Sequence, residues 1–167
     1  LTEIINFLPL ATFATDTAGS VILWNKAMEK LTSASARQVT GRGDYEYSFR
    51  IMGERVPGLL DLVFASDTEI QKYHYSGIER TSGCVRAQIN IPDLRGKTVT
   101  LEAVASLLYD QNGQVSGAIE TITEAGNMLL KDEKFHHLFQ TALKGSALET
   151  GDALGLLQAQ TRKKEKA

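Results

Sequence analysis

The chain has 167 residues, of which 43% are hydrophobic and 23% are charged, and its formal net charge is -2 at pH 7. This composition is ordinary for a globular protein with one main core, and it suggests neither an intrinsically disordered nor a membrane protein. The small negative charge argues against a nucleic-acid partner, because nucleic-acid-binding surfaces normally carry a basic patch.

Three features of the sequence bear on where the protein works. Cys84 is the single cysteine and cannot form an internal disulfide, and no charged-then-apolar leader opens the chain, so we expect a cytoplasmic location. No stretch approaches the roughly 18 apolar residues of a membrane helix, so no membrane contact is expected. The sequence begins at Leu1 instead of Met, which we interpret as a piece of a longer protein.

The first eight residues predict a short amphipathic helix. Leu1, Ile4, Ile5 and Leu8 follow one another at helical spacing, and Pro9 ends the pattern. An apolar helix face of this kind needs a covering surface. That surface is either a second copy of the chain or the sheet of the same chain.

Residues 11–24 predict a β-hairpin that leads into a capped helix. Polar and apolar residues alternate up to a turn at residues 16–19, and a second strand follows from Ser20 to Trp24. The side-chain oxygen of Asn25 can then cap a helix that reaches Leu31. We expect the Trp24 side chain in the core, beside this cap.

The middle of the chain predicts three further helices. Capping-box patterns open one short helix at Ser35 and another at Ser66, which is expected to run until Gly77. Residues 54–64 carry a helical stripe typical of a core-facing helix, and we assign no structure to residues 41–53. The stripe consists of Val56, Leu59, Leu60, Val63 and Phe64.

Three strands are predicted in the last part of the domain, at residues 84–91, 98–109 and 115–123. The last two alternate clearly and are joined by a turn that contains Asn112-Gly113, a strong hairpin signal. Two strands, then helices, then three strands give an α+β fold with a five-stranded antiparallel sheet and helices packed on one face. Beyond residue 124, apolar residues at helical spacing predict a helical extension.

The sequence contains no catalytic or metal-binding constellation. It lacks a serine nucleophile elbow, a zinc-binding histidine pair, a phosphate-binding loop and a cysteine pair. The Arg-Gly-Asp string at residues 42–44 is best explained as a loop. We therefore expect a protein that is not an enzyme, with no catalytic residues and no metal site.

Two stretches of the sequence resemble the first and last parts of a PAS domain. That family opens with a hydrophobic strand, an acidic-glycine turn, a strand ending in Trp-Asn and a helix closing on Leu-Thr. It ends with a long strand, a Leu-Tyr-Asp turn and a final strand. The matching residues are Phe13, Asp16, Gly19, Trp24, Asn25, Leu31 and Thr32 in the first part, and Leu108, Tyr109, Asp110, Gly117, Ala118 and Ile119 in the second.

The resemblance implies that residues 1–124 form a PAS sensory domain of a cytoplasmic signal-transduction protein, such as a sensor histidine kinase, and that residues 125–167 form a helical C-terminal extension or linker. The domain would bind a small ligand, mediate dimerisation and act on an output domain outside this sequence. Since the leading helix of such domains often packs between two subunits, we expect a homodimer formed through the N-terminal helix. The alternative is a ligand-free scaffold for dimerisation or protein interaction.

The resemblance also implies a ligand pocket between the sheet and the central helices. Some PAS domains bind haem through a helical histidine, but His74 is better interpreted as an ordinary residue at a helix end. The sequence around the cysteine of light-sensing relatives is absent, so we expect neither haem nor flavin. Core packing explains the candidate lining residues equally well. These are Phe49, Met52, Leu60, Phe64, Ile89, Leu101 and Ala103.

Overall fold

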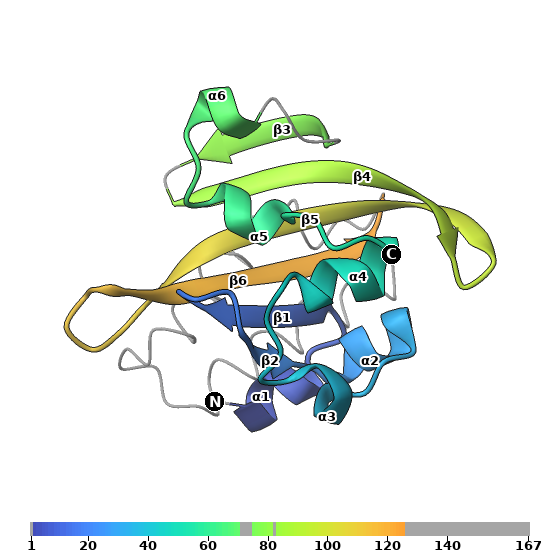
Figure 1. The fold of residues 1–167 in the computed structure, drawn as a ribbon, viewed down its shortest axis with the longest axis horizontal. Helices are drawn as coiled ribbons and strands as arrows, with labels where there is room; N and C mark the ends of the chain where they lie inside the picture. Colours follow the sequence, from blue (N-terminus) through green and yellow to red (C-terminus); the bar gives the residue numbers. More distant parts are fainter. Residues whose placement is uncertain (1, 71–74, 82, 126–167) are drawn as a thin grey trace, which may run out of the picture.

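A twisted antiparallel sheet organises the fold (Figure 1). The computed structural model describes residues 2–70, 75–81 and 83–125. Within them one sheet of six strands has the order β2-β1-β6-β5-β4-β3, and each neighbouring pair is antiparallel. The strands are β1 (Ala11–Asp16), β2 (Val21–Trp24), β3 (Ser76–Thr81), β4 (Cys84–Leu94), β5 (Lys97–Tyr109) and β6 (Val115–Glu124).

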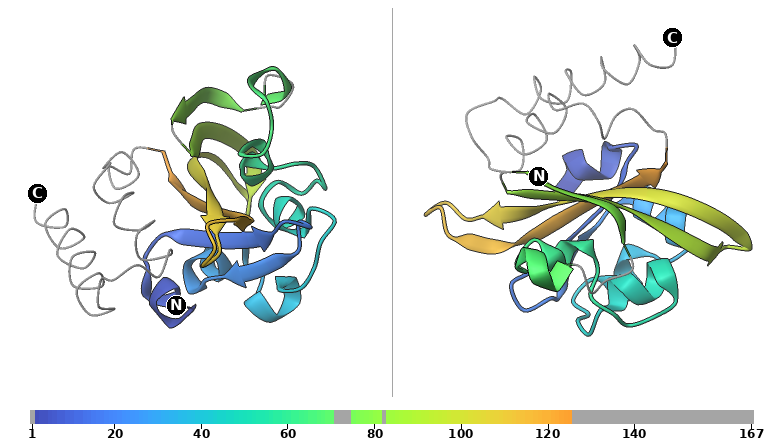
Figure 2. Two further views of the ribbon diagram at one scale, coloured as in Figure 1. Left: turned by 90° about the vertical axis from the view of Figure 1, so that its left-hand side faces the viewer. Right: turned by 90° about the horizontal axis from the view of Figure 1, so that it is seen from above.

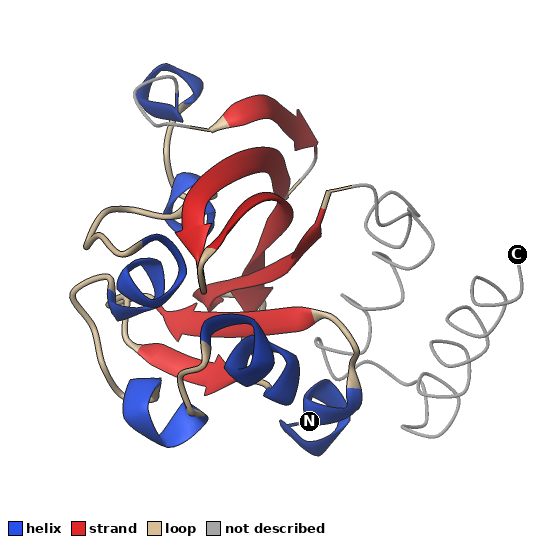
Figure 3. Ribbon diagram, turned by 90° about the vertical axis from the view of Figure 1, so that its right-hand side faces the viewer, coloured by secondary structure: helices blue, strands red, loops and turns tan. Residues whose placement is uncertain are grey.

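The helices are short, and they lie on both faces of the sheet. Helices α2 to α5 cover one face, which carries the larger hydrophobic cluster, whereas α1 lies on the opposite face (Figures 2 and 3). The α+β class predicted from the sequence is therefore confirmed, with α1 as an exception to the packing on one face. The helices are α1 (Thr2–Phe7), α2 (Lys26–Thr32), α3 (Ala36–Val39), α4 (Glu46–Met52), α5 (Leu59–Leu62) and α6 (Asp67–Ile70).

The predicted hairpins form with the expected turn chemistry. Asp16 Oδ1 accepts hydrogen bonds from the backbone N–H groups of Ala18 and Ser20, both at 2.9 Å. Asp110 Oδ1 accepts in the same way from residues 112 and 114, at 2.8 and 2.9 Å. Both turns are thus fixed by an aspartate at their first position, which is why local sequence predicts them well.

Trp24 and Asn25 occupy the interior positions that the sequence predicts. The Trp24 indole is buried against the Phe13 ring, with 5.6 Å between ring centroids, and donates a 3.0 Å hydrogen bond to the Ala34 carbonyl. Asn25 caps α2 by accepting from the Met28 N–H at 2.9 Å. This pair therefore joins the first hairpin to the helical layer.

The sheet has one strand more than the five expected. Of the helix predicted from Ser66, α6 lies within the described residues, and Ser76–Thr81 forms the edge strand β3, where the prediction continued the helix to Gly77. Strand β3 is mostly exposed and pairs only with β4. Its backbone pairing with an otherwise open edge stabilises it, and the local residue pattern does not reveal such pairing.

The predicted helix over residues 54–64 is wrong in length, because only Leu59–Leu62 is helical. Pro57 disfavours a helical conformation at Val56, and Gly58 is extended, with φ -95° and ψ -177°. A Cβ atom at Gly58 would lie 3.0 Å from a ring carbon of Tyr47, so a larger residue would crowd α4. Residues 41–53, to which we assigned no structure, contain α4.

The apolar stripe of α1 packs on the sheet of its own chain. Ile5 and Leu8 are buried together with Leu10, Ala14, Val104 of β5 and Ile119 of β6. The opposite side of the helix carries Phe7, whose side chain is 77% exposed. Of the two surfaces that could cover the stripe, the structure shows the intramolecular one for Ile5 and Leu8. From residue 126 onward, the helical extension predicted for residues 125–167 lies outside the part of the chain that the structure describes.

Candidate functional site

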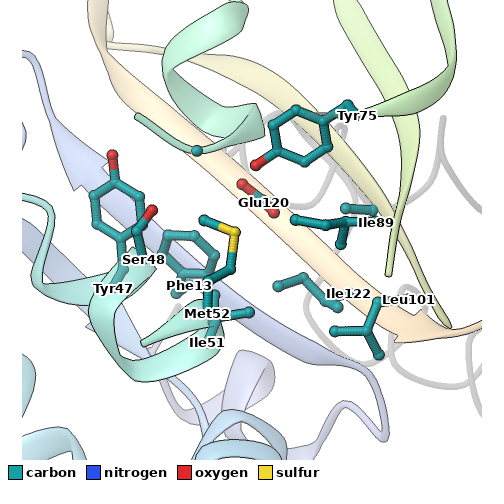
Figure 4. A pocket seen from close by; sticks show the side chains of 12 residues that line it. Phe13, Tyr47, Ser48, Ile51, Met52, Tyr75, Ile89, Leu101, Glu120 and Ile122 are labelled. Atoms are coloured by element: carbon teal, nitrogen blue, oxygen red, sulfur yellow. The ribbon is translucent and has the colours of Figure 1, made fainter. Parts of the chain in front are cut away.

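A small cavity lies between the sheet and helix α4 (Figure 4). Its volume is about 10 Å³, which is near the lower limit for one water molecule. The walls are mostly apolar, with a few polar groups contributed by different elements. The lining residues are Phe13, Tyr47, Ser48, Ile51, Met52, Gly58, Tyr75, Ile89, Leu101, Ala103, Glu120 and Ile122.

Glu120 is the charged residue of this cavity. It belongs to the middle of β6, and the inward pleat places its carboxyl group on the helical face of the sheet, where the residue is only 4% exposed. Its Oε2 accepts a 2.9 Å hydrogen bond from the Leu60 N–H at the start of α5. Among the described residues no Lys, Arg or His forms an ion pair with it.

Burial dominates the electrostatics of Glu120. Removal of water raises the pKa of its carboxyl group to about 8, because the charged form loses its hydration. The Leu60 N–H opposes this shift, whereas the negative Asp61 carboxyl group increases it. Glu120 is therefore mainly protonated at neutral pH and can donate as well as accept a hydrogen bond.

A tyrosine-aspartate pair closes the cavity beside α4. Tyr47 donates its hydroxyl hydrogen to Asp61 Oδ2, which also accepts a 2.7 Å hydrogen bond from the Gly58 N–H. Burial raises the pKa of Asp61, and the hydrogen bonds from Tyr47 and Gly58 oppose this change. Burial and the nearby Asp61 charge raise the pKa of the Tyr47 hydroxyl, so it remains a donor. The pair fixes α4 against the start of α5.

Ser48 and Tyr75 complete the polar groups of the cavity. The Ser48 side chain is buried, with the residue 1% exposed, and its Oγ has no hydrogen-bond partner among the described residues. The Tyr75 ring lies beside the Glu120 carboxyl group (Figure 4). Burial and the Glu120 charge both raise the pKa of the Tyr75 hydroxyl. An unpartnered hydroxyl and a carboxyl with one bond thus face the same small space.

The structure separates the predicted pocket residues into three groups. Met52, Ile89, Leu101 and Ala103 line the cavity. Leu60 is buried elsewhere in the core, but its backbone N–H binds Glu120. Whether any of these residues contacts a ligand stays a prediction.

Phe49 and Phe64 do not lie at the cavity, and both side chains point to the outside. Phe49 is 41% exposed, with the guanidinium groups of Arg50 and Arg55 over its ring at 5.6 and 5.1 Å from the centroid. Phe64 is 52% exposed and follows α5, which ends at Leu62.

Sequence reasoning missed the polar members of the site, above all Glu120 and Ser48. Both faces of β6 are buried from Gly117 to Ile122, so the strand lacks the alternation that would mark Glu120 as inward-facing. The available signal was an acidic residue within this otherwise apolar and small run. Ser48 lies in α4, which had no prediction, and His74 lies outside the described residues.

Residues 2–70, 75–81 and 83–125 contain neither a cluster of metal-ligating side chains nor a membrane-spanning helix. No group of three or more His, Cys, Asp or Glu side chains there could hold a metal ion. No helix in this part of the chain has the length and apolar character needed to cross a membrane.

Comparisons with known proteins give one family for this fold. The family model described as PAS fold matches residues 1–49. No curated protein sequence matches the chain. The PAS domain of a Colwellia psychrerythraea protein is 20% identical, with a TM-score of 0.49 over 73% of this chain and 91% of that one.

Two larger proteins contain a similar fold. An RNA-binding light-oxygen-voltage receptor is 18% identical, with a TM-score of 0.52 over 83% of this chain and 36% of that one. The Vibrio cholerae VqmA dimer is 15% identical, with a TM-score of 0.51 over 77% of this chain and 53% of that one. The present chain thus spans about a third and about half of these two proteins. The family match covers the first two strands, and the likeness to these structures shows that the chain has the PAS fold.

Proposed function

We propose that this PAS domain is the sensory or regulatory module of a signal-transduction protein, such as a sensor histidine kinase, and that it binds a small ligand between the sheet and α4. The light-oxygen-voltage protein and VqmA, both described as receptors, support the signalling role. The output domain would lie outside this sequence. The module itself would be non-catalytic, which the lack of catalytic motifs in the sequence supports.

One observation carries the ligand-binding part of the proposal. The cavity contains the Ser48 hydroxyl, which is buried without a partner, and the Glu120 carboxyl group, which has a single hydrogen bond. Buried polar groups are normally satisfied, and an unsatisfied one costs about 1–3 kcal/mol. Unpaired polar atoms in an apolar cavity are the arrangement expected where a bound molecule supplies the missing partners.

A ligand-free scaffold is the second candidate, and the size of the cavity favours it. A volume of about 10 Å³ is far below the roughly 300 Å³ or more of typical ligand pockets. A ligand larger than water would therefore require α4 or the Met52 side chain to move. The scaffold needs no such movement.

Native mass spectrometry of freshly purified protein, combined with an absorption spectrum, separates the two candidates. A sensory domain that retains its ligand is expected to show a small added mass that disappears on denaturation. Neither a Soret band nor flavin absorption is expected. A protein of unmodified mass that also shows no binding to a small-molecule library would favour the scaffold.

We also propose a homodimer formed through α1, supported by the 77% exposed Phe7 side chain and by the dimer described for VqmA. Phe7→Asp is expected to weaken dimerisation by at least about tenfold, because it places a charge in an apolar contact twice in a two-fold interface. Sedimentation velocity at several concentrations measures this change. Ile5→Asp is unsuitable, since Ile5 is buried within its own chain.

Phe64→Asp is the matched control for the dimer. Phe64 is also a large exposed side chain, but it follows α5 on the face of the sheet opposite α1 (Figure 2). The Phe64→Asp substitution should therefore leave the dimer intact. A wild-type chain that stays monomeric well above about 100 µM would contradict the proposed dimer.

The proposal includes a cytoplasmic location. Its support is the single cysteine in the sequence, since secreted domains of this size more often carry paired cysteines.

A further inference from the structure

We infer that the cavity recognises a small molecule with a basic nitrogen, whose N–H group pairs with the Glu120 carboxylate. The inference rests on the proposed ligand-binding function and adds the chemical class of the ligand. It starts from one contrast within the cavity: an acidic side chain is buried there, and no described residue supplies the cation that normally accompanies it.

None of the described cationic side chains neutralises Glu120. A buried carboxylate is costly unless a positive group or several hydrogen bonds compensate it. Glu120 has only the 2.9 Å hydrogen bond from the Leu60 N–H, at Oε2. In contrast, the buried Glu46 is bound by two arginines, Arg50 at 2.7 Å and Arg55 at 2.6 Å. The fold thus neutralises Glu46 with its own side chains and leaves Glu120 available to a ligand.

The surrounding walls also favour a positive ligand. The aromatic rings of Phe13, Tyr47 and Tyr75 line the cavity, and aromatic faces attract cations. Asp61 adds a second acidic group nearby, which would repel an anion. The free Ser48 hydroxyl can accept a hydrogen bond from a second donor on the ligand. The walls therefore favour a positive ligand over a carboxylate or phosphate, which Asp61 would repel.

Binding involves a proton but no other chemical change. A neutral base would take the proton from the Glu120 carboxyl group. The carboxylate and the protonated nitrogen of the ligand then form an ion pair. A ligand that arrives already protonated would instead displace the Glu120 proton to water. The complex is the same in both cases, with one proton shared between the nitrogen and the carboxyl group.

The small volume of the cavity limits the size of the molecule that can test the inference. Because the cavity holds about 10 Å³, even a small ring needs room from the flexible Met52 side chain, which lines it. We therefore choose imidazole as the probe and use both the wild-type chain and the Met52→Ala variant. Oxazole is the matched control, because its ring has the same size but has no N–H group and is not protonated near neutral pH.

Isothermal titration calorimetry at about pH 7.5 should show that imidazole binds the Met52→Ala variant and binds the wild type more weakly, whereas oxazole binds neither measurably. In ¹⁵N-resolved NMR spectra, the Leu60 amide signal should shift on binding, because this N–H contacts Glu120. Combining Glu120→Gln with Met52→Ala should weaken imidazole binding by about 30-fold or more relative to Met52→Ala alone, because the ion pair loses one buried partner.

Glu102→Gln in the Met52→Ala background is the control for that loss. Glu102 is a buried glutamate on the neighbouring strand β5, next to residues of the cavity but on the opposite face of the sheet. Imidazole affinity should stay within about twofold there. Equal binding of imidazole and oxazole, insensitive to Glu120→Gln, would overturn this inference and leave ligand binding itself intact. Binding of neither ring would overturn the inference, whereas the mass measurement above decides the proposed function independently.

Discussion

Replacing Glu120 with glutamine should stabilise the protein at and above pH 8 and have little effect near pH 4.5. In the folded chain, burial raises the pKa of Glu120 from 4.5 to about 8, whereas the unfolded chain releases the same proton near pH 4.5. Between these values the native state binds the proton and the unfolded state does not. The Glu120 contribution to the free energy of unfolding therefore falls as the pH rises through this window.

The size of the effect follows from the pKa shift. Each pKa unit corresponds to about 1.4 kcal/mol. The difference in the free energy of unfolding between Glu120→Gln and the wild type should therefore grow by on the order of 5 kcal/mol from pH 4.5 to pH 8. Urea denaturation at a series of pH values gives both curves. Subtracting them removes the part of the Asp61 contribution that does not depend on Glu120, since burial also raises the pKa of Asp61. Parallel curves would mean that Glu120 is already ionised in the native state.

Asn25→Ala is expected to lower the free energy of unfolding by about 4 kcal/mol or more, well above the cost of an ordinary helix cap. The Asn25 side chain is fully buried and makes four hydrogen bonds with backbone groups. Its Oδ1 accepts from the N–H groups of Thr12 and Met28, at 3.0 and 2.9 Å. Its Nδ2 donates to the carbonyls of Ile5 and Leu10, at 3.1 and 2.8 Å. Alanine leaves all four unpaired.

Ser35→Ala is the comparison for this second result. Ser35 also stands at the start of a helix, α3, but it is exposed, so water can replace any lost bond. Its expected cost is about 1 kcal/mol or less, measured by the same urea denaturation. If the two substitutions cost the same within error, Asn25 would act only as a cap and would not hold α1, β1 and α2 together.

The elements predicted correctly from sequence share one property, which is that neighbouring residues stabilise them. The turns at Asp16 and Asp110 are closed by bonds within four residues, and the cap at Asn25 acts on the third residue after it. The last two strands carry enough alternation and turn chemistry to be placed within a residue or two of their observed ends. Local chemistry of this kind is present in the sequence itself.

The tertiary structure alone decided what happens where distant segments meet. Strand β3 pairs with the open edge of β4, and Gly58, just before α5, lies against the Tyr47 ring. The polar site has the same origin. Glu120 contacts the backbone of Leu60 in α5, 60 residues earlier in the chain. The strand register turns the Glu120 side of β6 toward α4, where none of the described cationic side chains neutralises the buried carboxyl group. A side-chain period of two makes that choice of face sensitive to a shift of a single residue, and strand pairing across the sheet fixes it.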